Sequence, residues 1–280
     1  MHAKAAPGTG VRYHLPAAIK GLELLSCSDV DFRFAPHFHE AYCIWLNTAS
    51  AETYTHKGCS GILPPGSFGI FAPGEVHSNQ AFDSSSRQLL SFYLDAATVQ
   101  QIAAELTDHS SLSSELATGL HADRDAYRTL IDLWLTLTTS PSALHRQSLF
   151  RTTLALLLSR YATAALPTGK IGDEPQRVAK IIELFHDRLE DDLQLDELAT
   201  WVDCTPSYLI RCFKKASGLT PHAYLLQLRL EQSRRLLQQG QSIVQASLLS
   251  GFSDQSHLTR HFKRKFGLTP GAYRQQVTKT

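Results

Sequence analysis

The sequence predicts an α+β protein with an N-terminal β-barrel, a helical segment and a C-terminal all-α domain. Three observations lead to this fold class. Short alternating or β-branched runs, separated by Pro- and Gly-containing turns, occupy residues 13–95. Helical periodicity takes over from residue 96. One supersecondary unit then occurs twice near the C-terminus. A length of 280 residues also favours two domains.

The first domain is expected at residues 13–164 and begins with strands such as 42–46, 67–71 and 88–94. Many short strands at this spacing favour a sandwich or a small barrel. We expect residues 1–12 to be mobile. The predicted helices that follow are 96–106, 123–137 and 142–164. The last is apolar on more than one side, so it must pack against the barrel, a neighbouring helix or a second subunit.

Residues 165–175, ALPTGKIGDEP, are rich in Pro, Gly and charge, and we interpret them as a linker. The second domain, 176–280, starts with a predicted helix at 176–189. It contains a repeat with a spacing of 49 residues. Eleven residues of the first copy recur unchanged in the second: Ser207, Leu209, Arg211, Phe213, Lys214, Gly218, Leu219, Thr220, Pro221, Ala223 and Tyr224.

Each copy is predicted to be a short helix, a tight turn and a second helix, at about 195–216 and 243–266. Gly251 is a suitable helix end, and Ser253 or Asp254 can cap the next helix, as Thr205 can in the first copy. The second helix of each copy has an apolar back and a polar front. The front side chains are Ser207, Ile210, Arg211, Lys214 and Lys215 in the first copy, and Gln255, Ser256, Arg260, Lys263 and Arg264 in the second.

Such a front fits the major groove of double-stranded DNA, because Arg reads guanine, Gln reads adenine and Lys contacts phosphate. The alternative is a pair of amphipathic helices with solvated charges. Residues 204–280 contain twelve Lys and Arg against two Asp and Glu, a net charge of +10, whereas the whole chain carries +1. A basic module on an acidic remainder is typical of nucleic-acid binding, and the duplication favours it further.

The stretch GFSDQSHLTRHFKRKFGLTPGAYR, residues 251–274, resembles the signature of the AraC/XylS family of bacterial transcription factors. The resemblance covers residues 178–277 and implies two helix-turn-helix units joined by a long helix at about 221–238. It also implies a cytoplasmic activator that works with RNA polymerase, with a homodimer formed by the helices after the barrel. The implied base-facing residues are Ser207, Ile210, Arg211, Gln255, Ser256 and Arg260.

The patterns PHFHEAYCIWL and PPGSFGIFAPGEVH resemble the cupin-type sensor domain found at the N-terminus of many members of this family. This resemblance covers about residues 20–95 and implies a pocket for a small-molecule effector. Pockets combine apolar walls with a few polar groups. The candidate ligand-binding residues are His37, His39, Tyr42, Trp45 and His77.

His37, His39 and His77 raise the alternative of a metal site, because metal-binding cupins use an HxH pair and a later His. His37 and His39 are expected on one strand face. The position of the expected Glu is taken by Cys43 or Ile44, and three His with a thiolate could hold zinc or another divalent metal. Because the carboxylate is missing, we expect no cofactor, and histidines that line a ligand pocket instead.

The leading hypothesis is therefore a ligand-responsive, sequence-specific DNA-binding regulator that is not an enzyme. Two alternatives remain: a metal-dependent cupin enzyme fused to a DNA-binding domain, and a binder whose barrel serves only for dimerisation. The five cysteines are scattered, which suggests reduced thiols. Neither a signal peptide nor a membrane-spanning run is expected.

Overall fold

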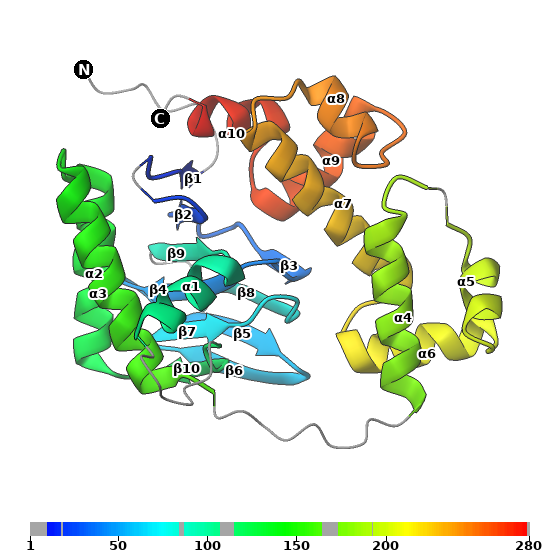
Figure 1. Cartoon of the computed structure of the whole chain (residues 1–280), viewed down its shortest axis with the longest axis horizontal. Coiled ribbons are helices and arrows are strands. Elements are labelled where there is room, and N and C mark those ends of the chain that lie inside the picture. The colour runs from blue at the N-terminus through cyan, green and yellow to red at the C-terminus, as the bar shows by residue number, and fades with distance from the viewer. Residues whose placement is uncertain are drawn as a thin grey trace.

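The structure, a computed structural model, describes residues 10–17, 19–83, 87–106, 115–163, 173–191 and 193–278. Within these ranges the N-terminal domain is mainly β and the C-terminal domain is entirely helical (Figure 1). The strands are β1 (Val11–His14), β2 (Leu22–Cys27), β3 (Phe34–His37), β4 (Tyr42–Asn47), β5 (Glu52–His56), β6 (Cys59–Leu63), β7 (Phe68–Phe71), β8 (His77–Ala81), β9 (Leu89–Leu94) and β10 (Gly119–His121).

The strands form two antiparallel sheets whose inner faces meet, and this pair of sheets is named the barrel. One sheet has the order β1-β2-β9-β4-β7-β10, and the other has the order β3-β8-β5-β6. Side chains alternate between the two faces of a strand. On β4, Cys43 and Trp45 therefore point between the sheets, whereas Tyr42 and Ile44 point to the outside of the six-stranded sheet. The predicted α+β fold class is confirmed.

Three helices cover the outer face of the six-stranded sheet: α1 (Ala96–Leu106), α2 (Arg124–Thr139) and α3 (Ala143–Tyr161). Figure 1 shows α2 and α3 side by side along this face. Leu130 of α2 and Leu154 of α3 are buried with Ile44 and Phe92 of the sheet. The apolar sides of the third helix thus pack against both the sheet and its neighbour helix.

The C-terminal domain consists of α4 (Asp173–Asp187), α5 (Leu195–Trp201), α6 (Pro206–Ser217), α7 (Pro221–Gln238), α8 (Ile243–Leu248), α9 (Gln255–Phe266) and α10 (Pro270–Val277). The pairs α5–α6 and α8–α9 are the two helix-turn-helix units, and they lie toward opposite ends of the long helix α7 (Figure 1). None of the helices in the described ranges combines the length and apolar character needed to cross a membrane.

The repeated residues produce the same local structure twice. Gly218 ends α6 and Gly267 ends α9, both in the left-handed region with φ of 82° and 76°. Thr220 and Thr269 then cap α7 and α10 by accepting a backbone N–H bond, and Pro occupies the first helical turn each time. The shared sequence therefore fixes where the second helix of each unit, its recognition helix (α6 or α9), stops and where the next helix starts.

Three details differ from the sequence-based expectations. Strand β1 already starts at Val11, because Val11 and the neighbouring Tyr13 are buried in the core, so residues 11 and 12 are ordered; residues 1–9 lie outside the described residues. Strand β3 ends at His37 after a register shift, so His39 follows the strand rather than lying on it. Helix α4 begins at Asp173, and the rest of the expected linker lies outside the described residues.

Candidate functional site

The front of α6 carries the predicted DNA-contacting side chains of the first unit. Ser207, Arg211, Lys214 and Lys215 are exposed, whereas Ile210 is half-buried. The opposite face of the helix packs into the domain core through the fully buried Leu209, Cys212 and Phe213. Thr205 caps the helix start by accepting the Tyr208 N–H at 3.3 Å, as the sequence predicts.

The front of α9 repeats this arrangement. The exposed side chains are Gln255, Ser256, Arg260, Lys263 and Arg264, and the buried face is formed by Leu258, Phe262 and Phe266. Asp254, one of the two predicted caps, accepts the His257 N–H at 2.8 Å. That hydrogen bond holds the pKa of Asp254 below its usual value. Both helices thus present long donors and cations away from the core, which suits contacts to base edges and phosphates.

Lys265 is an exception on the basic helix α9, because only 8% of it is exposed. Its Nζ lies 2.6 Å from Oε1 of Glu231 on α7 and donates to the Phe38 carbonyl of the barrel at 3.1 Å. Burial raises the pKa of Glu231 and lowers the pKa of Lys265, and the ion pair opposes both shifts. Lys265 therefore connects the two domains and does not belong to the exposed basic front of α9.

A buried polar network continues from this ion pair along the domain interface. Arg234 of α7 lies 2.8 Å from Glu231 and also forms an ion pair with Glu23 on β2. Tyr273 of α10 donates its hydroxyl proton to Glu23 at 2.5 Å. Nearer the surface, Arg235 pairs with Glu40. Each buried charge thus has a partner in the other domain, directly or through one neighbour.

Apolar contacts accompany this network. Tyr13 of β1 packs edge-on against Tyr273, and the second helix-turn-helix unit shares one core with the inner face of the barrel. The glycines that end the recognition helices also lie close to the barrel. A Cβ on Gly218 would lie 3.2 Å from Cβ of Val76, and a Cβ on Gly267 would lie 2.8 Å from Cγ2 of Val11.

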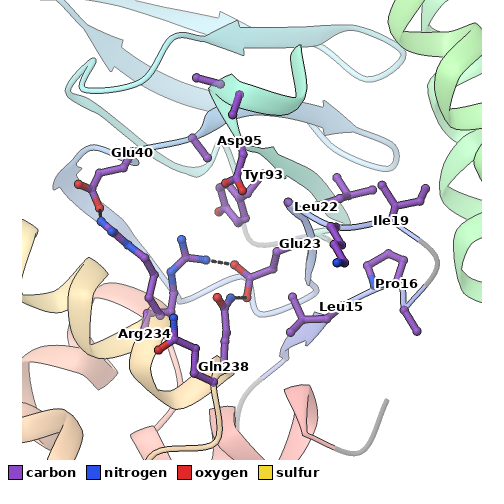
Figure 2. A pocket seen from close by; sticks show the side chains of 18 residues that line it. Leu15, Pro16, Ile19, Leu22, Glu23, Glu40, Tyr93, Asp95, Arg234 and Gln238 are labelled. Carbon is purple, nitrogen blue, oxygen red and sulfur yellow. Dashed lines mark hydrogen bonds and ion pairs between the residues drawn. The ribbon is translucent and has the colours of Figure 1, made fainter. Parts of the chain in front are cut away.

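A pocket of about 740 Å³ lies between the barrel and α7 (Figure 2). In Figure 2 the side chains of Arg234 and Gln238 point from α7 toward Glu23. The walls combine apolar side chains of the barrel with charged and amide groups of both domains. The lining residues include Leu15, Ile19, Leu22, Glu23, Arg234 and Gln238. This volume falls within the range of small-molecule sites.

The three predicted histidines meet between the two sheets, close to the same interface. His37, His39 and His77 are each at most 5% exposed, and one ring nitrogen of each lies within 4.8 Å of those of the other two. Burial lowers the pKa of His77 to about 4 and the pKa values of His37 and His39 well below 6.5. All three rings are therefore neutral at pH 7.

The other two candidate pocket residues lie in different places. Trp45 lines the small cavity beside the histidines, a space of only about 10 Å³ that Cys43 also lines. Tyr42 lies on the other face of β4 in the core beneath the helices, because three positions separate it from Trp45 along a strand. The structure therefore does not bring Tyr42 to the histidine cluster. Burial raises the pKa of Cys43 to about 12, so it is a thiol at neutral pH.

No local pattern in the sequence indicates the domain interface or its pocket. Glu23, Glu231 and Arg234 carry no local motif, and they meet only because the two domains dock. One signal was available for Lys265. It corresponds to Ala216 in the first copy of the repeat, so the change from Ala to Lys marks a position where the two units differ in their surroundings.

Two family descriptions match most of the chain. Residues 20–154 match the AraC-like ligand binding domain, and residues 198–276 match the helix-turn-helix domain. The chain belongs to the AraC/XylS family. It joins an AraC-type ligand-binding domain to a helix-turn-helix DNA-binding domain, which is the organisation of a transcription regulator.

Named relatives and solved structures agree with this assignment. The uncharacterized HTH-type transcriptional regulator YbfI of Bacillus subtilis is 26% identical over 80% of this chain and 81% of its own length. The HTH-type transcriptional activator RhaS of Escherichia coli is 30% identical over 42% of this chain and 41% of its own. ToxT of Vibrio cholerae shares the fold with a TM-score of 0.58 at 11% identity, covering 94% of this chain and 100% of ToxT. A structure of ToxT bound to an unsaturated fatty acid has a TM-score of 0.58 at 15% identity and covers 92% and 96%.

Proposed function

We propose that this regulator binds a small organic effector in the pocket between the barrel and α7, and that the effector changes how the DNA-binding domain docks. The pocket carries this proposal, because its walls come from both domains. A ligand there contacts Glu23 of the barrel and Arg234 of α7 together, so its affinity must differ between the docked and undocked arrangements. Only such a difference in affinity shifts a conformational equilibrium.

The mixed walls of the pocket favour an effector with both polar and apolar parts. Leu15, Ile19 and Leu22 offer an apolar surface, and Arg234 and Gln238 offer donors. The histidine cavity, by contrast, has a volume of only about 10 Å³, which leaves no room for an organic substrate. The size of this cavity supports a regulator over a metal-dependent enzyme.

For DNA recognition, we propose that Arg211, Gln255 and Arg260 read base edges from α6 and α9, with Ser207, Ile210 and Ser256 beside them. Lys214, Lys215, Lys263 and Arg264 contact phosphates. All of these except Ile210 are exposed on the fronts of the two helices. The two units then bind successive major grooves about one helical turn apart.

We further propose a cytoplasmic homodimeric activator that contacts RNA polymerase. Two apolar side chains on the outer side of the helical layer support a dimer, Leu135 of α2 at 52% exposed and Leu144 of α3 at 74% exposed. The family and the RhaS match support activation.

The decisive experiment is a selection of genomic DNA fragments bound by the full-length protein at moderate salt. We expect enrichment of a site with two half-elements about one helical turn apart. The neighbouring genes then suggest effectors to test. If folded protein enriches no sequence, with or without those effectors, the proposed function is wrong.

A matched pair of variants tests the pocket. Leu22→Ala enlarges the pocket on the barrel side, and Leu25→Ala changes the same strand on its inner face without lining the pocket. We expect Leu22→Ala to change the effector concentration needed for a DNA-binding response, and Leu25→Ala to leave it unchanged at equal folded fraction. An equal response in both variants contradicts the pocket assignment.

A further inference from the structure

The histidine cluster has a hydrogen-bond pattern that neutral rings alone do not satisfy. His37 donates its Nδ1–H to the Ala35 carbonyl at 2.8 Å, and His77 donates its Nδ1–H to the Glu75 carbonyl at 2.9 Å. A neutral imidazole has one N–H, so both rings keep a lone pair on Nε2. His37 and His77 are also direct partners across β3 and β8, which places their rings next to each other.

His39 is the third member of the cluster. Neither of its neutral tautomers, with the proton on Nδ1 or on Nε2, satisfies both of its neighbours. Its Nε2 lies 3.0 Å from Nε2 of His37, and its Nδ1 lies 3.6 Å from Oε1 of Glu231. If Nε2 carries the proton, the Nδ1 lone pair faces a carboxylate. If Nδ1 carries it, two Nε2 lone pairs face each other at 3.0 Å. Buried Nδ1 of His39 has no hydrogen-bond partner among the described residues.

A cation at the Nε2 atoms removes this conflict. It accepts the lone pairs of all three rings and fixes the proton of His39 on Nδ1, where it points at Glu231. Each ring then points its other N–H at an oxygen: His37 and His77 donate to backbone carbonyls, and His39 faces the Glu231 carboxylate at 3.6 Å. This arrangement is the usual support of metal-bound histidines.

We propose that His37, His39 and His77 bind one divalent transition-metal ion through their Nε2 atoms, and that Glu231 is the positioning residue for His39. Bonds of 2.0–2.1 Å in a tetrahedral site place nitrogens about 3.3 Å apart. Nε2 of His37 and Nε2 of His39 are 3.0 Å apart, and one nitrogen of each ring lies within 4.8 Å of the others, so the rings must move together to reach this spacing. The cavity of about 10 Å³ beside the rings is about the size that one water-sized species needs. Imidazole ligands suit zinc, nickel, copper or iron.

The placement of Glu231 gives this site a regulatory consequence. The three ligands belong to the barrel, but Glu231 lies on α7 of the DNA-binding domain and also pairs with Lys265 of α9. The bound metal therefore stabilises the arrangement in which α7 is docked on the barrel. By linkage, docking must strengthen metal binding by the same factor. This goes beyond the proposed effector pocket, and its test needs neither DNA nor effector.

The first test is a Zn²⁺ titration of chelator-treated full-length protein by calorimetry, repeated with Co²⁺ to follow its visible absorption. We expect saturable binding of one ion per chain, lost in His37→Ala and His77→Ala. His145→Ala, which removes an exposed histidine of α3, is the matched control and keeps the binding. Binding that is absent in the wild type, or unaffected by the two cluster variants, overturns the site.

The second test addresses the coupling between domains. Glu231→Gln removes the charge that faces His39, and Glu40→Gln removes a carboxylate at the same interface that pairs with Arg235 instead. We expect Glu231→Gln to weaken Zn²⁺ binding about 10–100-fold, as loss of an outer partner does, and Glu40→Gln to leave it unchanged. Equal affinities in both variants overturn the role of Glu231.

Hydrogen exchange of the wild type provides a test that does not depend on a variant being folded. We expect saturating Zn²⁺ to slow amide exchange in α7 and at the end of α9, where Lys265 lies. The same amides in chelator-treated wild-type protein serve as the reference. Binding of one Zn²⁺ with unchanged exchange in both segments overturns the coupling.

Discussion

The two helix-turn-helix units share eleven residues in register, yet they dock on the barrel in different ways. The core of the first unit includes Phe38 of the barrel, and the unit meets the barrel through apolar contacts, such as Tyr224 stacked on Phe38 at 4.6 Å. In the second unit, the equivalent Tyr273 donates a hydrogen bond to Glu23, and Lys265 is buried where the first unit has Ala216. The shared residues thus build the unit, and the residues that differ determine its attachment.

This difference has a consequence for regulation. The apolar contacts of the first unit do not require one fixed geometry. The buried ion pairs of the second unit, by contrast, are satisfied in one arrangement only. We therefore expect the second unit to be the one whose release from the barrel is coupled to ligands.

Substitution of the buried Lys265 is expected to give the largest change in stability, because this lysine is present only in the second unit. Lys265→Ala leaves Glu231 buried without its nearest cation, and loss of one partner of a buried pair costs about 3–5 kcal/mol. The free energy of unfolding of the full-length protein, measured in urea, checks this. Lys263→Ala, two residues away and exposed, is the control and should change stability by less than about 0.5 kcal/mol. A similar small effect for both would remove the contrast between the units.

Substitution of the matched arginines tests whether the units read DNA alike. Arg211→Ala and Arg260→Ala should each cost about 1–3 kcal/mol of binding free energy at one position of the operator if they read bases. Binding to a panel of single-base variants of the selected site measures this. Lys214→Ala should instead weaken binding to all sites equally and reduce the salt dependence. A uniform loss for either arginine would make that residue a phosphate contact.

The smallest expected effect is a difference in how the two helix caps contribute to stability as the pH changes. Thr205 caps α6 with a hydroxyl and Asp254 caps α9 with a carboxylate. The pKa of Asp254 is depressed in the folded state, so its charge stabilises the protein above the unfolded pKa of about 3.9 and ceases to do so as pH falls through the lower folded pKa. Asp254→Asn keeps a capping side chain, so its stability deficit should shrink below about pH 4.

The uncharged cap provides the comparison for this titration. Thr205→Ala should cost about 1 kcal/mol at every pH, because no proton is bound or released. Thermal unfolding from pH 7 to pH 3 measures both deficits. If the Asp254→Asn deficit does not change with pH, the hydrogen bond to His257 contributes nothing through its charge.

Much of the local structure was predictable, because it depends on residues close together in the chain. Helix α1 and the long helix α7 have the expected boundaries, since Pro221 opens α7 after a capping Thr and α1 follows strand β9 directly. The caps Thr205 and Asp254 follow from short-range hydrogen bonding in the same way. The confirmed fold class combines such local signals with a repeat that chance does not produce.

The binding surfaces between the domains were not predictable, because they join residues about 200 positions apart. No pattern links Glu23 to Arg234 or His39 to Glu231. Tyr42 was grouped with Trp45 by residue type, but strand alternation separates the two side chains. His39 reaches His37 through a bend after β3 rather than through regular alternation. Only docking of the two domains brings the charged residues together.

The glycines that end the recognition helices limit how this protein could change. Asn is the usual substitute for Gly at a left-handed helix end. At Gly267, however, any side chain would meet Val11 and Phe32 of the barrel, and at Gly218 it would meet Val76. At Gly267, where the Cβ would lie 2.8 Å from Val11, a change to Asn would therefore preserve the helix and press it away from the barrel. A single substitution at Gly267, which ends α9, is thus expected to give a regulator whose DNA-binding domain no longer responds to the barrel.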